Sequence, residues 1–172
     1  ILKQISKNPY TEKDDKFFDK ASFKILVHEI VDSFKDFSKK KIIINEDDYK
    51  KDYLITKKIE IIYSLKNIID NALKFSSNKI EIFLSSNENE LRIKVEDDGE
   101  GFSKQILGFL GDPYINKRDL ENNKEGLGLG IFIAKVFLER LSAVINFYNL
   151  ENEGAAVDIS WQKKDLINLK LI

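Results

Sequence analysis

The sequence predicts a two-layer α/β (α+β) sandwich, in which a mixed, mostly antiparallel sheet of about five strands is covered on one face by three helices. Three observations support this prediction. Apolar residues recur at helical spacing in three separate segments of the chain. Other short runs alternate apolar with polar residues, as half-buried strands do. Helices and strand pairs follow one another along the sequence, which favours helices gathered on one face of a sheet.

Composition limits the class of protein. With 172 residues, of which 42% are hydrophobic and 11% aromatic, we expect one domain with one buried core. The 28 basic and 29 acidic residues nearly cancel, so no net field attracts nucleic acid or an anionic membrane. The absence of cysteine excludes disulfides, cysteine-ligated zinc and thiol catalysis within this chain. No apolar run approaches the roughly 18 residues that span a bilayer, so we expect no membrane contact by this fragment.

The N-terminal part of the sequence predicts a junction, a helix and a strand. Residues 1–20 are polar and charged, and we interpret them as a junction from an upstream helix, which the family resemblance given below would make a dimerisation helix. Ser22 is a typical N-cap residue, and the apolar spacing after it predicts a helix of roughly 15 residues. Residues 41–45 predict a buried strand that ends at the acidic turn 46–48. We expect its neighbour to be the short stretch near Tyr53.

The remaining elements follow in order. Residues 57–75 have the clearest helical periodicity, and strands are predicted at 78–85 and 89–95 with a turn between them. A short helix at 105–110 precedes a polar loop, 111–125, whose length suggests a function. A helix that begins in 126–130 runs to about 141, and strands are predicted at 143–148 and 155–161. We place the folded domain at 21–165 and a C-terminal tail at 166–172.

A polar line runs along the predicted helix 57–75. Asn67, Asn71 and Lys74 lie at i, i+4 and i+7, on one side of that helix. An amide oxygen can coordinate Mg²⁺, and a lysine ammonium supplies a point charge to phosphate oxygens. The line would suit a nucleoside triphosphate, although by itself it is more typical of a solvated helix face.

Two glycines follow a carboxylate at the end of the strand 89–95. Glycine lacks the Cβ that would block a flat ligand, so Gly99 and Gly101 permit close approach. Asp97 could accept the exocyclic amino proton of adenine. An ordinary Asp-Gly turn explains this pattern equally well.

The strongest local signal is a set of alternating glycines at a predicted helix start. Backbone N–H groups there can point at an anion, and the helix dipole favours negative charge. The spacing is neither that of a Rossmann motif nor that of a Walker loop. Glycines needed only for helix packing are the alternative to a phosphate cradle made by Gly126, Leu127, Gly128, Leu129 and Gly130.

In order and spacing, these three elements resemble the N, G1 and G2 boxes of the histidine kinase catalytic domain, within the ATPase superfamily that includes gyrase, Hsp90 and MutL. The resemblance covers about residues 22–162 and implies a Bergerat-type ATP-binding fold with ATP and Mg²⁺ as cofactors. It implies that Asn71 binds Mg²⁺ and that Asn67 and Lys74 contact the phosphates and serve catalysis. It assigns the remaining nucleotide contacts to Asp97, Gly99, Gly101 and residues 126–130.

The loop 111–125 resembles the ATP lid of this family. Gly111-Asp112-Pro113-Tyr114 stands at the F box, and with the glycine motif it resembles the RegB/PrrB redox-sensing kinases. The resemblance implies that Tyr114 grips the nucleotide and that Lys117 and Arg118 lie near the phosphates. Tyr114 departs from the usual Phe, and Gly154-Ala155-Ala156 lacks the hydroxyl residue that many members place near adenine. We therefore expect one polar contact to the base to be missing or water-mediated.

The resemblance implies a protein-histidine kinase. Asn67 stands where hydrolytic relatives have a glutamate that activates water, and an amide cannot act as a general base. The implied acceptor is a histidine on dimerisation helices of the same parent protein, with a response regulator downstream. The parent would be an inner-membrane sensor with this domain in the cytoplasm.

His28 is the only histidine, and we reject it as the acceptor because it lies too close to the N box. We therefore do not expect the chain to autophosphorylate alone. Two alternatives stay open: an ATP-gated clamp or ATPase module, and a degenerate domain that binds a partner but no nucleotide.

Overall fold

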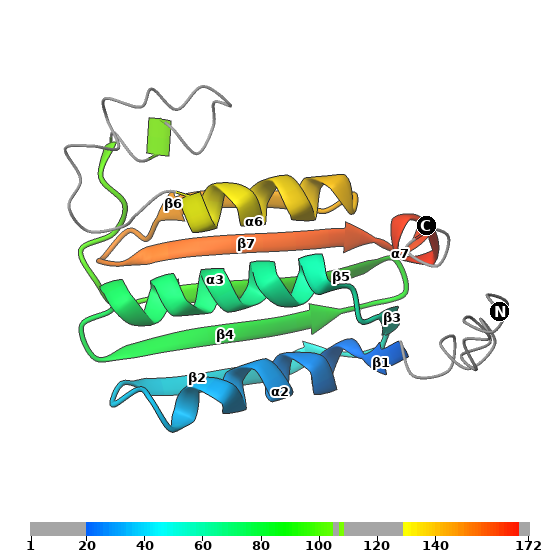
Figure 1. The fold of residues 1–172 in the computed structure, drawn as a ribbon, viewed down its shortest axis with the longest axis horizontal. Coiled ribbons are helices and arrows are strands. Elements are labelled where there is room, and N and C mark those ends of the chain that lie inside the picture. Colours follow the sequence, from blue (N-terminus) through cyan, green and yellow to red (C-terminus); the bar gives the residue numbers. More distant parts are fainter. Residues whose placement is uncertain (1–19, 105–106, 109–128, 169–172) are drawn as a thin grey trace, which may run out of the picture.

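The computed structural model describes residues 20–104, 107–108 and 129–168. A five-stranded sheet of order β2-β4-β5-β7-β6 has its three long helices on one face (Figure 1). β2 runs parallel to β4, and the other neighbouring strands are antiparallel. The predicted sandwich is thus confirmed, with strands β2 (Lys41–Tyr49), β4 (Lys79–Ser86), β5 (Glu90–Asp97), β6 (Val144–Asn149) and β7 (Ala155–Gln162), and helices α2 (Phe23–Lys35), α3 (Ile59–Phe75) and α6 (Leu129–Arg140).

Smaller elements close the two ends of the described chain. β1 (Lys20–Ser22) pairs antiparallel with β3 (Leu54–Thr56), and the short helix α7 (Lys163–Asn168) follows β7. Leu166 of α7 is buried and joins the hydrophobic core. Apart from Lys20, the predicted junction lies outside the described residues. Of the predicted helix 105–110, Leu107 and Gly108 are described, and both are helical.

The core lies between the helices and one face of the sheet. Burial alternates along β4, because every second side chain points toward the helices. α2 begins as predicted, with Ser22 Oγ accepting from the backbone N–H of Ile25 at 3.3 Å. Phe23 and Trp161 meet edge to face in this core, with ring centroids 5.8 Å apart. Trp161 Nε1 is buried and has no hydrogen-bond partner in the described part of the chain, so its ring contributes by packing alone.

Two predictions about β2 are wrong. The acidic residues 46–48 do not end the strand but lie within it, where the register with β4 shifts between Asn45 and Asp48. Lys24 and His28 of α2 contact the Glu46 carboxylate, so the strand can continue through an acidic residue. The neighbour of β2 is β4, whereas the stretch near Tyr53 leads into β3. In this parallel pairing with β4, Ile42 and Ile44 pack against the core.

Within the described residues, no helix combines the length and the apolar character needed to cross a membrane.

Phe23 and Phe37 provide a matched test of this core. Phe23 is 1% exposed and Phe37 is 89% exposed. We expect Phe23→Ala to lower the free energy of unfolding by about 3–5 kcal/mol, because it leaves a cavity beside Trp161. Phe37→Ala should change it by less than about 0.5 kcal/mol. Urea denaturation followed by tryptophan fluorescence measures both, and equal effects would contradict the packing described here.

Candidate functional site

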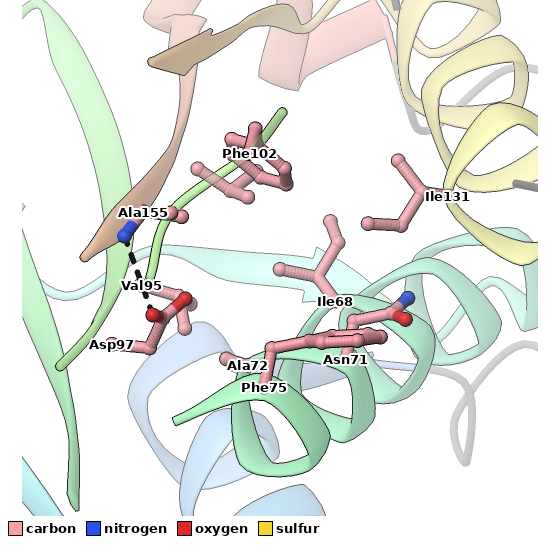
Figure 2. Close-up of a pocket in the computed structure, with 11 residues that line it drawn as sticks. Ile68, Asn71, Ala72, Phe75, Val95, Asp97, Phe102, Ile131 and Ala155 are labelled. Carbon is pink, nitrogen blue, oxygen red and sulfur yellow. Dashed lines mark hydrogen bonds between the residues drawn. The ribbon is translucent and has the colours of Figure 1, made fainter. Parts of the chain in front are cut away.

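A pocket opens between α3, the end of β5, the beginning of β7 and the beginning of α6 (Figure 2). It holds about 490 Å³ of empty space, counting the part open to solvent. The lining is mainly apolar, with two polar side chains, and consists of Ile68, Asn71, Ala72, Phe75, Val95, Asp97, Gly101, Phe102, Ile131, Ala155 and Val157.

Asp97 is fixed at one end of this pocket. Its Oδ1 accepts from the backbone N–H of Gly99 at 2.9 Å. It also accepts from the backbone N–H of Ala155 at 3.3 Å, the dashed line in Figure 2. Burial raises the pKa of Asp97 above its ordinary value of 3.8, although these two N–H donors act to lower it. The carboxylate is therefore a positioned hydrogen-bond acceptor within apolar walls.

The two glycines after Asp97 allow a close packing that side chains would prevent. A Cβ on Gly99 would lie 2.1 Å from the backbone oxygen of Phe75, at the end of α3. Gly101 has a φ of +81°, and a Cβ there would lie 2.9 Å from Oδ1 of Asn149. These contacts bring the turn after β5 against both α3 and β6, so the predicted need for glycine has a physical cause.

Asn67 and Asn71 lie one turn apart on α3, as predicted. Asn67 Nδ2 donates to the Tyr63 carbonyl at 2.9 Å, and Asn71 Nδ2 donates to the Asn67 carbonyl at 3.0 Å. The helix backbone thus binds both amide nitrogens, which leaves the side-chain oxygen of Asn71 as the group that it can offer to a ligand in the pocket. Asn71 lines the pocket, whereas Asn67 lies one turn earlier on α3.

Lys74 completes the polar line on α3. Its side chain is exposed, and its Nζ lies 5.1 Å from the ring centroid of Phe75, which itself lines the pocket. The ammonium thus lies beside one of the residues that line the pocket.

The glycine motif is described only at its end. Gly130 packs against Asn67, because a Cβ on Gly130 would lie 2.5 Å from Asn67 Oδ1. Helix packing therefore explains this one glycine, as the alternative interpretation proposed. Leu129 is the first residue of α6. Outside the described residues lie Tyr114, Lys117, Arg118, Gly126, Leu127 and Gly128.

Two side chains that bind the backbone around the pocket could not be predicted from the sequence. Asn149 Oδ1 accepts from the backbone N–H of Phe102 at 2.7 Å, and its Nδ2 donates to the Phe102 carbonyl at 2.9 Å. Lys40 Nζ donates to the Leu73 carbonyl at 2.6 Å. Neither residue lies in a motif, and each contacts a segment more than thirty positions away in the sequence. A periodicity or spacing argument has no signal for such contacts.

The metal-binding potential of the site rests on amide oxygen. No cluster of three or more histidine, cysteine or acidic residues that could hold a metal occurs among the residues described. Asn71 can offer one neutral oxygen ligand, which fits Mg²⁺ bound mainly by phosphate oxygens and water. His28, on α2, lies apart from the pocket, and its Nε2 is 2.6 Å from Oε1 of Glu46. The arrangement can hold a flat polar ring beside Asp97 and an anionic chain along α3.

Comparison with known sequences identifies a family. The profile described as "Histidine kinase-, DNA gyrase B-, and HSP90-like ATPase" matches residues 56–165. The sensor histidine kinase RegB of Cereibacter sphaeroides is 34% identical over 131 residues, which are 66% of this chain and 28% of that protein. Sporulation kinase A of Bacillus subtilis is 27% identical over 100 residues, which are 57% of this chain and 16% of that protein. The chain thus spans less than a third of the length of these relatives.

Solved structures share the fold. The catalytic domain of histidine kinase ThkA superposes with a TM-score of 0.69 at 19% identity, covering 84% of this chain and 94% of that one. The histidine kinase domain of the E. coli osmosensor EnvZ gives a TM-score of 0.62 at 18% identity, covering 84% of this chain and 88% of that one. At these identities the likeness establishes the fold alone.

Gly99 and Gly108 test the close contact between the turn after β5 and α3. Gly99→Ala should lower the free energy of unfolding by roughly 1–3 kcal/mol, since its Cβ would overlap a backbone oxygen that cannot easily move. Gly108 is exposed and helical, and a Cβ there meets no atom within 4 Å. Gly108→Ala should be neutral or stabilise by up to about 1 kcal/mol. Thermal and urea denaturation compare the two, and a Gly99→Ala variant as stable as Gly108→Ala would rule out the contact.

Proposed function

This chain belongs to the family of histidine kinase-, DNA gyrase B- and HSP90-like ATPases, and from this membership we propose that it is the ATP-binding catalytic domain of a two-component sensor histidine kinase. One observation carries the proposal. A half-buried carboxylate at one end of an apolar pocket faces a line of amide and ammonium groups that leads outward along α3. The similarity to RegB supports a kinase over the other branches of the family.

The inner end of the pocket suits adenine. Ile68, Phe75 and Phe102 provide apolar walls that can enclose a flat ring. Asp97 can accept a hydrogen bond from the exocyclic amino group. Ala155 offers no hydroxyl, and its backbone N–H is already bound to Asp97. Base recognition therefore depends mainly on one carboxylate and on shape.

The outer end of the site suits the phosphates. Asn71 would place its side-chain oxygen on Mg²⁺, while Asn67 and Lys74 would contact phosphate oxygens. When bound, Mg²⁺ spreads the negative charge that develops on the transferred phosphoryl group. The backbone N–H groups of the glycine motif, residues 126–130, would complete the phosphate site, and Tyr114, Lys117 and Arg118 would serve the lid.

Asn67 favours transfer over hydrolysis. Its side chain is an amide whose nitrogen donates to the Tyr63 carbonyl, so it cannot take a proton from water. We propose that the nucleophile is a histidine on dimerisation helices of the parent protein. The imidazole nitrogen would bond to the γ-phosphorus as the bond to the bridging oxygen breaks, and ADP would leave.

The proposed partners follow from this reaction. They are the dimerisation helices that carry the acceptor histidine and a response regulator that later receives the phosphoryl group. The near balance of 28 basic and 29 acidic residues gives no support for binding to nucleic acid. We propose a cytoplasmic location for this domain within an inner-membrane sensor.

Asp97→Asn tests the adenine site. We expect wild-type protein to bind a non-hydrolysable ATP analogue with Mg²⁺ saturably, and the variant to bind at least about tenfold more weakly, because a charged acceptor is lost. Isothermal titration calorimetry measures both, with Glu100→Gln as the control at an exposed carboxylate in the same loop. Absence of binding by folded wild-type protein would refute the proposal and favour a domain that has kept the fold without the activity.

The raised pKa of Asp97 predicts a pH dependence. The ionised carboxylate is a stronger hydrogen-bond acceptor than the neutral acid, so binding should weaken as pH falls through a pKa that lies above 3.8. The nucleotide phosphates titrate as well, but they do so equally for wild type and Asp97→Asn. The affinity of wild type divided by that of Asp97→Asn should therefore decrease as the pH falls. A ratio that stays constant down to the lowest pH at which both proteins remain folded would show that Asp97 ionisation does not govern binding.

A further inference from the structure

Lys40 lies just before β2, where the topology brings it to the end of α3. β2 is parallel to β4, and Lys41 pairs with Lys79 at the beginning of that strand. The Lys40 side chain therefore faces the turn that joins α3 to β4. Its Nζ donates to the carbonyls of Leu73 at 2.6 Å and Lys74 at 3.3 Å, and also to that of Ser76.

Leu73 and Lys74 belong to the last turn of α3, whose carbonyls have no partner within the helix, although Ser76 Oγ also donates to the Leu73 carbonyl at 3.0 Å. The last backbone oxygens of α3 carry the negative end of the helix dipole, which a cation stabilises. The three carbonyls that Lys40 binds belong to residues on both sides of Phe75. The Phe75 ring lines the pocket, and the Phe75 backbone oxygen packs against Gly99. Lys40 thus holds the backbone that places Phe75.

The other half of the same turn is held by a carboxylate. Asp98 Oδ1 accepts from the backbone N–H groups of Ser77 at 2.8 Å, Asn78 at 3.0 Å and Lys79 at 3.1 Å. Burial acts to raise the pKa of Asp98, but these donors outweigh it and the pKa is lowered. A cation on the carbonyls and an anion on the N–H groups fix the turn from two sides, directly beside Asp97.

We propose that Lys40 is a positioning residue of the nucleotide site, which acts through the end of α3 to hold Phe75 and Gly99 in the geometry that binds the base. This inference rests on the proposed function. It also assigns Lys40 to the base end of the site, whereas Lys74 serves the phosphate end. Burial raises the pKa of Asp97 most, the Gly99 and Ala155 N–H groups lower it, and the Lys40 charge lowers it least.

The test compares a nucleoside with a nucleotide. Lys40→Met keeps the apolar stem and removes the charge and its donors. We expect it to weaken binding of adenosine and of a non-hydrolysable ATP analogue by the same factor, about tenfold, because the base contact is shared by both ligands. Lys74→Met should weaken the ATP analogue only. NMR titrations at a temperature where every variant is folded provide the affinities.

Three further variants complete the experiment. Lys39→Met, at the exposed neighbouring lysine, should bind like wild type. Lys40→Arg keeps the charge and the donors and should bind within about threefold of wild type. Lys40→Leu, which also lacks the charge and the donors, replaces Lys40→Met if the latter does not fold, with the same expected pattern. A merely structural role would lower the melting temperature without changing the affinity of the folded protein.

The outcomes separate the two hypotheses. Wild-type affinity for adenosine in Lys40→Met, or an equal loss in Lys40→Arg, would overturn the positioning role while the proposed function stands. A loss confined to the ATP analogue would also overturn it, because Lys40 would then act on the phosphates. A folded wild-type protein that binds neither ligand would overturn both. An equal loss for both ligands that Lys40→Arg avoids would establish the inference.

Discussion

The close contact between the turn after β5 and the end of α3 determines the geometry of the whole site. Gly99 permits it, since a Cβ there would lie 2.1 Å from the backbone oxygen of Phe75. The contact brings the Asp97 carboxylate into the same pocket as Asn71, although one comes from a strand and the other from a helix. With a side chain at position 99, strand and helix would move apart and the pocket would lose one wall.

The sheet topology collects the groups that stabilise this contact. Parallel pairing of β2 with β4 brings Lys40 to the end of α3, and antiparallel pairing of β7 with β5 brings the Ala155 N–H to Asp97. The end of β6 lies beside them, where the Asn149 amide binds both backbone groups of Phe102. Hydrogen bonds between these side chains and the backbone therefore surround an apolar pocket. They satisfy backbone N–H and C=O groups that would be costly to bury without a partner.

The sequence predicts those features that depend on local periodicity. The spacing of Asn67 and Asn71 places them on one side of a helix, and alternation identifies β4 and β5, because both patterns arise from backbone geometry alone. The partner of β2 could not be found this way, since nearness in sequence favoured the stretch near Tyr53 over β4. Lys40 and Asn149 were missed for a related reason. Their contacts span 33 and 47 positions, and only the assembled sheet brings the partners together.

The described side chains indicate which part of the proposed reaction this domain can perform. Asp97 is the carboxylate of the pocket, but it lies at the end assigned to the base and is already bound by two N–H groups. Along α3, toward the phosphates, the assigned groups are two amides and an ammonium, none of which can accept a proton from water at neutral pH. Such a site can hold and orient a triphosphate without activating water beside it. In the proposed reaction the reactive group comes from another domain, so phosphoryl transfer would depend on domain docking as well as on nucleotide binding.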